Sequence, residues 1–179
     1  MDIRFDGKVC LVTGSARGIG FAIAEELVAS GARVAMVDIL EDRLREAAAT
    51  LSAHAATAAN GSSATAYVQD LTKVSELGPL VERIRADLGE IDVLIQPAAV
   101  GPQRYAADIT EQEWDAVFAI NTKALFFLMR EVVGQSMVPR GSGSVVNFSS
   151  IAGLVGMRKP LSSAHYSASK GAVAALTRQ

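Results

Sequence analysis

The sequence has little of several features that mark specialised classes of protein. It contains one cysteine, Cys10, so no disulfide can form within the chain, and its apolar neighbours predict a small buried side chain. The formal net charge of −2 provides no basic field for nucleic acid or anionic lipid. The longest apolar run, residues 124–129, is far too short to span a bilayer, and residues 1–4 lack a signal-peptide pattern. We therefore expect a cytoplasmic protein with no nucleic-acid or membrane partner.

What the sequence does contain is an ordinary globular balance, with 50% hydrophobic and 20% charged residues. Its 179 residues suffice for one domain with a sizeable core, which we expect at residues 1–179. Apolar runs alternate with amphipathic stretches, which predicts an α/β fold with a doubly wound, mostly parallel sheet and helices on both faces. The expected strands are residues 9–12, 32–37, 64–68, 91–95 and 144–149; the expected helices are residues 21–28, 41–56, 73–88, a segment capped by Thr110, 122–137 and 165–178.

The first expected strand leads into three closely spaced glycines, Gly14, Gly18 and Gly20. An amphipathic segment follows, so the order is strand, glycine turn and helix, as in the first half of a nucleotide-binding βαβ unit. One glycine would let the chain turn off the strand, another would let backbone approach a pyrophosphate, and the third would let the helix lie close to the strand. The helix N-terminus would offer N–H groups to the phosphates. Glycine-rich turns also occur for purely structural reasons, so this spacing alone leaves both interpretations open.

The second expected strand ends at Asp38, which lies 18 residues after Gly20. Dinucleotide-binding units carry the acid for the adenosine ribose hydroxyls at about 20 residues from the glycines. A carboxylate at this place repels a 2′-phosphate, so Asp38 favours NAD over NADP. Arg17 in the glycine loop either softens that preference or is a solvated loop cation.

A tyrosine and a lysine, Tyr166 and Lys170, lie four residues apart near the end of the sequence. On a helix they share one face, and the ammonium group stabilises the phenolate. Ser150 directly follows the last expected strand, and ligands of open α/β sheets bind at the carboxyl ends of strands. Ser150 and Asp38 therefore both fall where a cofactor and a substrate would bind.

Taken together, these motifs resemble the short-chain dehydrogenase/reductase family of NAD(P)-dependent enzymes, over residues 7–179. Residues 13–20, T-G-S-A-R-G-I-G, resemble the family's T-G-x-x-x-G-x-G cofactor loop. The resemblance implies a Rossmann fold and an oxidoreductase that transfers a hydride between NAD(H) and an alcohol or ketone. The catalytic tetrad that it implies is Asn121, Ser150, Tyr166 and Lys170. The cofactor contacts that it implies are Gly14, Ser15, Arg17, Gly18, Ile19, Gly20, Asp38, Asp70, Leu71, Ala98, Tyr166 and Lys170.

The resemblance also implies a role for each member of the tetrad. Tyr166 exchanges a proton with the substrate oxygen, and Ser150 hydrogen-bonds that oxygen. Lys170 holds the nicotinamide ribose, and Asn121 positions a water that links Lys170 to solvent; otherwise Asn121 serves only as a hydrogen-bonding residue near a helix start. The family pairs helices between subunits, and residues 122–137 are apolar on most of their surface, so we expect a homo-oligomer, a dimer or tetramer. No catalytic role is expected for three further polar residues: His54, Ser149 and His165.

Three features depart from the family pattern. Residues 96–99 are Gln-Pro-Ala-Ala where the family usually has Asn-Asn-Ala-Gly, and the loss of a backbone donor at Pro97 bears on cofactor affinity. Ser150 and Tyr166 are 16 residues apart, more than is common, so residues 157–160 are expected to reshape the rim of the substrate pocket. The sequence ends at Gln179, where the family continues for about 60 residues with two more strand–helix units. We therefore expect C-terminal strands to be missing, and keep as an alternative a truncated, inactive cofactor-binding or interaction protein.

Overall fold

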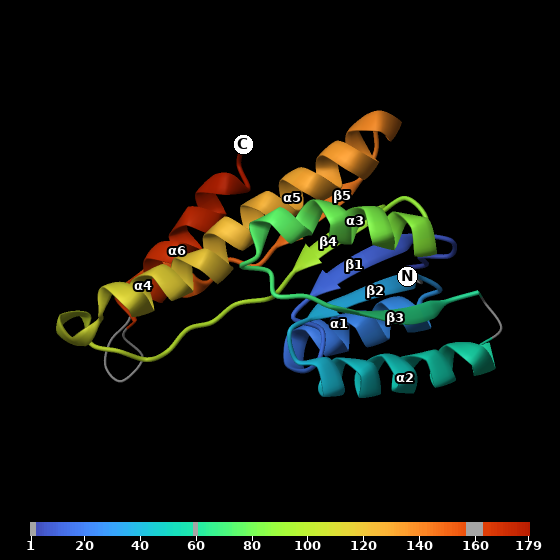
Figure 1. Ribbon diagram of the computed structural model, residues 1–179, viewed down its shortest axis with the longest axis horizontal. Coiled ribbons are helices and arrows are strands. Elements are labelled where there is room, and N and C mark those ends of the chain that lie inside the picture. Colours follow the sequence, from blue (N-terminus) through green and yellow to red (C-terminus); the bar gives the residue numbers. More distant parts are fainter. Residues whose placement is uncertain (1–2, 59–60, 157–162) are drawn as a thin grey trace.

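The computed structural model describes residues 3–58, 61–156 and 163–179, and its centre is a parallel sheet (Figure 1). Every strand pairing within this sheet is parallel. The strand order β3-β2-β1-β4-β5 confirms the predicted doubly wound, Rossmann-like architecture. The strands are β1 (Val9–Thr13), β2 (Arg33–Asp38), β3 (Ser63–Val68), β4 (Val93–Gln96) and β5 (Ser144–Asn147).

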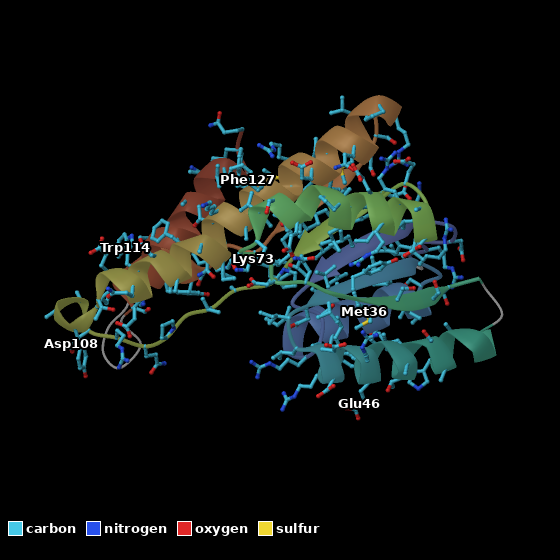
Figure 2. All side chains as sticks on the ribbon, viewed as in Figure 1. Met36, Glu46, Lys73, Asp108, Trp114 and Phe127 are labelled. Atoms are coloured by element: carbon cyan, nitrogen blue, oxygen red, sulfur yellow. The ribbon has the colours of Figure 1, made fainter. Side chains whose placement is uncertain are left out.

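The helices cover both faces of the sheet, because alternate residues of the buried strands point to opposite sides. Cys10 and Val12 of β1 belong to a core with α1 and α2, whereas Val9 and Leu11 belong to a core with α3 and α5. Figure 1 shows these two helix pairs on opposite sides of the sheet. In Figure 2, Met36 lies between the sheet and α2, while Glu46 projects outward. The α-helices are α1 (Gly18–Ala29), α2 (Glu41–Ala58), α3 (Val74–Leu88), α4 (Glu111–Phe118), α5 (Leu125–Val132) and α6 (Ala164–Leu176).

The direction of winding changes between β1 and β4. From β1 the chain passes outward through β2 and β3, then returns to place β4 and β5 on the other side of β1. The loops that leave β1 and β4 therefore diverge to opposite faces of the sheet. In doubly wound folds a crevice opens at this switch point, outside the carboxyl ends of the strands.

The helical region from Glu111 to Met137 differs from the expected pair of separate helices. A capping box joins Thr110 and Glu113 at its start, as predicted. No break precedes residue 122; instead α4 continues into a π-helical segment, η2 (Ala119–Ala124), then into α5 and a second π-helical segment, η3 (Val133–Met137). The wider turns of a π-helix reorient side chains without ending the helix, and they are frequent at functional sites.

Strands β4 and β5 are shorter than the sequence pattern suggested. β4 begins at Val93, because the Asp92 carboxylate accepts a hydrogen bond from Val9 N at 3.0 Å just before it. β5 ends at Asn147, and the chain then turns through Ser150 into a short 3-10 helix, η5 (Ile151–Gly153). The expectation about residues 157–160 lies outside the described residues. Within the described ranges, no helix is both long enough and apolar enough to cross a membrane.

Candidate active site

A cavity of about 490 Å³ lies at the carboxyl ends of β1 to β4. The loops that follow these four strands form most of its wall, and Ile120 of η2 completes it. This position is the switch point of the sheet, where doubly wound folds bind their ligands. Nine of the predicted cofactor contacts line it: Gly14, Arg17, Gly18, Ile19, Gly20, Asp38, Asp70, Leu71 and Ala98.

The glycine loop has a shape that side chains at two positions would destroy. Gly14 has a φ of +61°, and a Cβ there would lie 2.9 Å from the Cα of Ala98 in the loop after β4. At Gly20 a Cβ would collide with the carbonyl oxygen of Gly14, so the start of α1 lies directly against the turn. Two of the roles expected for the glycines, the sharp turn and the close helix, therefore have a visible steric basis.

Ser15 is placed differently from the other predicted contacts of this loop. Its side chain is fully buried and does not line the cavity. Its hydroxyl lies 3.4 Å from the carbonyl oxygen of Val37, to which it donates. The Ser15 side chain and its backbone N–H, which also donates to Val37 O, thus tie the glycine loop to the end of β2.

The carboxylate of Asp38 is held at the cavity wall by two backbone amides. Its Oδ2 accepts from the N–H of Ala16 at 3.0 Å, and its Oδ1 accepts from the N–H of Leu40 at 3.1 Å. Each oxygen keeps further acceptor capacity, since a carboxylate offers about four lone pairs. Ile39, beside it, is 60% exposed and also lines the cavity, so an apolar surface adjoins the anionic group.

Asp70 is held in a similar way at the end of β3. Its Oδ1 accepts from the side-chain hydroxyl of Thr72 at 2.6 Å and from the backbone N–H of Thr72 at 2.9 Å. These two hydrogen bonds, the side-chain bond first, lower the pKa of the Asp70 carboxyl. The group is therefore ionised at neutral pH, and both of these hydrogen bonds go to Oδ1.

Tyr166 and Lys170 lie one turn apart on α6, as predicted, but outside the wall of the cavity. Lys170 Nζ is 5.8 Å from the centroid of the Tyr166 ring and donates to the carbonyl oxygen of Phe148 at 2.6 Å. Lys170 is only 3% exposed, and this burial lowers the pKa of its ammonium group. Ser149 donates in return to the backbone oxygen of Lys170 at 2.8 Å, which gives Ser149 the structural role expected of it.

Asn121 joins the loop after β4 to α6. Its Nδ2 donates to the carbonyl oxygen of Val100 at 2.8 Å and to the hydroxyl of Ser169 at 3.0 Å. Its Oδ1 accepts from Val100 N at 2.9 Å, and the residue is fully buried. Ser169, which the sequence analysis did not single out, also donates to the carbonyl oxygen of Tyr166 at 2.7 Å. In the sequence, the position of Ser169 three residues after Tyr166 is the feature that could have indicated this contact.

Ser150 and Tyr166 come from the two segments that meet beside this network. The Ser150 hydroxyl accepts from Ala152 N at 3.2 Å and so caps η5. The Tyr166 ring lies on the backbone of Gly101, where a Cβ would be 2.7 Å from its Cδ2. Between these two described residues there is no hydrogen bond, so the structure brings their segments together without joining their hydroxyl groups.

His165 is buried, and its Nδ1 lies 3.1 Å from the hydroxyl of Ser163, which itself donates to the carbonyl oxygen of Pro102 at 2.9 Å. This contact ties His165 to the start of α6 and, through Ser163, to the loop after β4. In residues 3–58, 61–156 and 163–179 no cluster of three or more His, Cys, Asp or Glu side chains could hold a metal ion.

Several cavity-lining residues were not among the predicted contacts. All but Ile120 follow the ends of β2, β3 and β4, so the rule that ligands bind at the carboxyl ends of strands was the signal that could have found them. Pro97 and Ala99 of the atypical Gln-Pro-Ala-Ala segment are in the wall, so this departure falls on the site itself. The unpredicted lining residues are Ile39, Leu40, Gln69, Pro97, Ala99, Val100 and Ile120.

Known proteins share both the sequence pattern and the fold. The sequence profile of a family described as short chain dehydrogenase matches residues 8–179. The chain is 34% identical to an NAD-dependent glycerol dehydrogenase of Listeria innocua over 177 residues, covering 99% of this chain and 65% of that protein. It is 38% identical to 5-keto-D-gluconate 5-reductase of Escherichia coli over 172 residues, covering 96% of this chain and 64% of that protein.

Among solved structures, the crystal structure of an NAD⁺-bound xylitol dehydrogenase superimposes with a TM-score of 0.87 at 34% identity. The match covers 98% of this chain and 64% of that chain. The chain thus spans about 64% of the length of the relatives that it matches.

Proposed function

This chain belongs to the short-chain dehydrogenase family, and on that basis we propose that it binds NAD in the cavity and exchanges hydride between NAD(H) and an alcohol or ketone. The observation that carries the proposal is the cavity wall, where the glycine loop and the fixed carboxylate of Asp38 face the same space. Relatives that are dehydrogenases of polyols or reductases of a keto sugar acid support this reaction class.

The residues of the cavity fit a dinucleotide. Gly14 and Gly18 both have positive φ angles, and no heavy atom lies within 4 Å of a Cβ built at Gly18. The glycine loop therefore presents bare backbone at the N-terminus of α1, where N–H groups bind a pyrophosphate. The Asp38 carboxylate would accept from the ribose hydroxyls, and the ionised Asp70 would accept from the adenine amino group.

Asp38 is also our basis for proposing NAD rather than NADP. Both carboxylate oxygens are fixed by backbone amides, so the negative charge cannot swing away from a 2′-phosphate. The neighbouring side chains Ile39 and Leu40 are exposed and apolar, so they offer no cation to a phosphate. Arg17 lines the cavity and is the cation that would soften the preference.

When bound, NAD supplies the two-electron chemistry by accepting or donating a hydride. We propose that Tyr166 transfers the hydroxyl proton of the substrate and that Ser150 hydrogen-bonds the same oxygen. The ammonium group of Lys170 has three N–H donors. One of them donates to the carbonyl oxygen of Phe148, and the other two would bind the nicotinamide ribose. Asn121, through Val100 and Ser169, holds the loop after β4 beside α6. A homo-oligomer is proposed as well, because Trp114 of α4 and Phe126 of α5 are 40% and 38% exposed.

A cofactor-binding protein without turnover is the second candidate. It is favoured by the missing hydrogen bond between Ser150 and Tyr166 and by the position of Tyr166 outside the cavity wall. Substitution Tyr166→Phe separates the two candidates, because it removes the proton donor and leaves the cavity intact. We expect turnover of secondary alcohols by the unmodified protein, its loss in Tyr166→Phe, and NAD binding that stays within a few-fold. Absence of turnover in the unmodified protein with normal NAD binding would favour the second candidate.

A further inference from the structure

Two loops lie against α6 on either side of the proposed catalytic tyrosine. The loop after β4 reaches the Tyr166 ring through Gly101, and its Pro102 oxygen accepts a hydrogen bond from Ser163 at 2.9 Å. The segment after β5 reaches α6 through Gly153, where a Cβ would be 2.6 Å from the backbone nitrogen of Gly171. Both loops are therefore anchored to the helix that carries Tyr166.

The segment after β5 exposes large apolar side chains, whereas the loop after β4 exposes both Val100 and the polar residues Gln103 and Arg104. Ile151, Leu154 and Val155 are 63%, 66% and 51% exposed, and all three lie within five residues after Ser150. Val100, on the opposite loop, is 43% exposed. Single exposed apolar side chains are ordinary, but a cluster at the edge of a site marks a surface that a ligand covers.

Three polar side chains near Tyr166 are already engaged, whereas the buried Nε2 of His165 has no hydrogen-bond partner among the described residues. The Asn121 amide is used by Val100 and Ser169, and the Ser163 hydroxyl by Pro102 and His165. Arg104, on the loop after β4, is paired with Glu113 at 2.7 Å. A polyol needs a partner for each hydroxyl group that leaves water, because an unpaired buried polar group is costly. On the segment after β5, by contrast, the large exposed side chains of the described residues are all apolar.

We propose that the substrate is a hydrophobic secondary alcohol or its ketone, with an alkyl or alicyclic body that covers Ile151, Leu154, Val155 and Val100, rather than a polyol. The inference rests on the proposed oxidoreductase function and specifies its substrate class. The alcohol carbon gives up a hydride to NAD⁺, its hydroxyl proton leaves through Tyr166, and the ketone is released. The binding energy gained by covering the apolar body of the substrate would help to orient its reacting carbon.

The test is kcat/KM with NAD⁺ for 2-butanol, 2-hexanol, 2-octanol, glycerol and xylitol. We expect kcat/KM to rise by up to about fourfold for each methylene group that the protein covers. 2-Octanol should therefore exceed 2-butanol by about tenfold or more, and should also exceed both polyols. Leu154→Ser and Ile151→Ser should lower the value for 2-octanol by about fivefold each, because each removes apolar contact, and should lower the value for 2-butanol by less.

Val138→Ser is the matched control, since Val138 is 68% exposed but lies at the far end of the helical region, before β5. It should change none of these values. Preference for xylitol or glycerol, or a flat alcohol series, would overturn the apolar substrate class and leave the proposed function standing. No turnover of any alcohol or of the matching ketones would overturn the proposed function and this inference with it. Loss of self-association in Leu154→Ser, with unchanged kinetics, would assign the apolar cluster to an interface between copies.

Discussion

The two helices that carry the candidate site, α1 and α6, are attached to the molecule by different forces. The buried residues of α1 are Gly20, Ala24, Leu27 and Val28, so this helix is held by close backbone approach and apolar packing. The buried residues of α6 are His165, Ser169, Lys170 and Val173, of which three are polar. The adjacent strands differ in the same sense, because β1 is buried throughout whereas β5 alternates between exposed and half-buried residues.

This difference separates what supports the proposed cofactor site from what supports the proposed catalytic residues. Around the glycine loop, geometry is fixed by a core that tolerates little change in volume. Around Tyr166, geometry is fixed by hydrogen bonds from Asn121, Ser149 and Ser163 to neighbouring backbone or side chains. Each such bond contributes about 1 kcal/mol net, but it is directional, so it orients the helix more than it stabilises the fold.

The contrast between β1 and β5 predicts the largest difference in stability. Leu11→Ala in β1 should lower the free energy of unfolding by about 2–5 kcal/mol, because Leu11 is fully buried between two helix layers. Val146→Ala in β5 should lower it by less than about 1 kcal/mol, since Val146 is 44% exposed. Urea unfolding followed by circular dichroism measures both. Equal losses would remove the distinction between the two regions.

A smaller loss is expected where α1 meets the glycine turn. Gly20→Ala should cost about 3 kcal/mol, because its Cβ overlaps the Gly14 carbonyl oxygen and the backbone must shift. It should also abolish NAD binding. Gly134→Ala is the control, since a Cβ there meets no atom within 4 Å; this helical substitution should raise stability by about 0.5–1 kcal/mol. Normal NAD affinity in Gly20→Ala would show that the turn is not the phosphate site.

A loss of stability smaller than the two above is expected at Asn121, in the hydrogen-bond network beside α6. Asn121→Ala should lower the free energy of unfolding by about 1–3 kcal/mol, since it leaves the half-buried N–H and C=O of Val100 without their partners. Hydrogen exchange should quicken at residues 97–102 and leave β1 unchanged. Thr122→Val is the matched control next to it, because it removes a single contact of 3.4 Å to the Ser169 oxygen. Faster exchange spread evenly over the sheet would contradict the local role.

The smallest predicted change has the opposite sign. Lys170→Met should raise the free energy of unfolding by about 0.5–2 kcal/mol at neutral pH while abolishing turnover, because a buried ammonium group is replaced by an apolar side chain of similar length. No carboxylate pairs with Lys170 in the described part of the chain. Stability measured against pH with both proteins tests this, and a less stable Lys170→Met would contradict it.

The pH dependence of that difference follows from the direction of the pKa shift. Burial lowers the pKa of Lys170 in the folded protein below its ordinary value of 10.5. Between the two pKa values the unfolded chain binds more protons than the folded one, so the stability of the unmodified protein rises with pH. The advantage of Lys170→Met should therefore shrink as the pH approaches 10.5 and stay constant below the folded-state pKa.

The sequence predicted the α1 region more completely than the α6 region, for a physical reason. The glycine turn, the buried strand and Asp38 are local signals, since a few adjacent residues determine them. The π-helical segment at Asn121 and its bonds to Val100 and Ser169 join parts that lie far apart in the chain. Likewise, nothing near Lys170 in the sequence indicates that its ammonium group bonds to Phe148. Such contacts depend on how the elements pack, which local patterns do not specify.

A calorimetric titration of NAD and NADP into the unmodified protein, Gly20→Ala and Tyr166→Phe tests the central claim most directly. We predict that the unmodified protein binds NAD more tightly than NADP, because the Asp38 carboxylate repels a 2′-phosphate. We predict that NAD binding is lost in Gly20→Ala and retained in Tyr166→Phe, since Gly20 lines the cavity and Tyr166 does not. Absence of NAD binding to the unmodified protein, or tighter binding of NADP than of NAD, would contradict it.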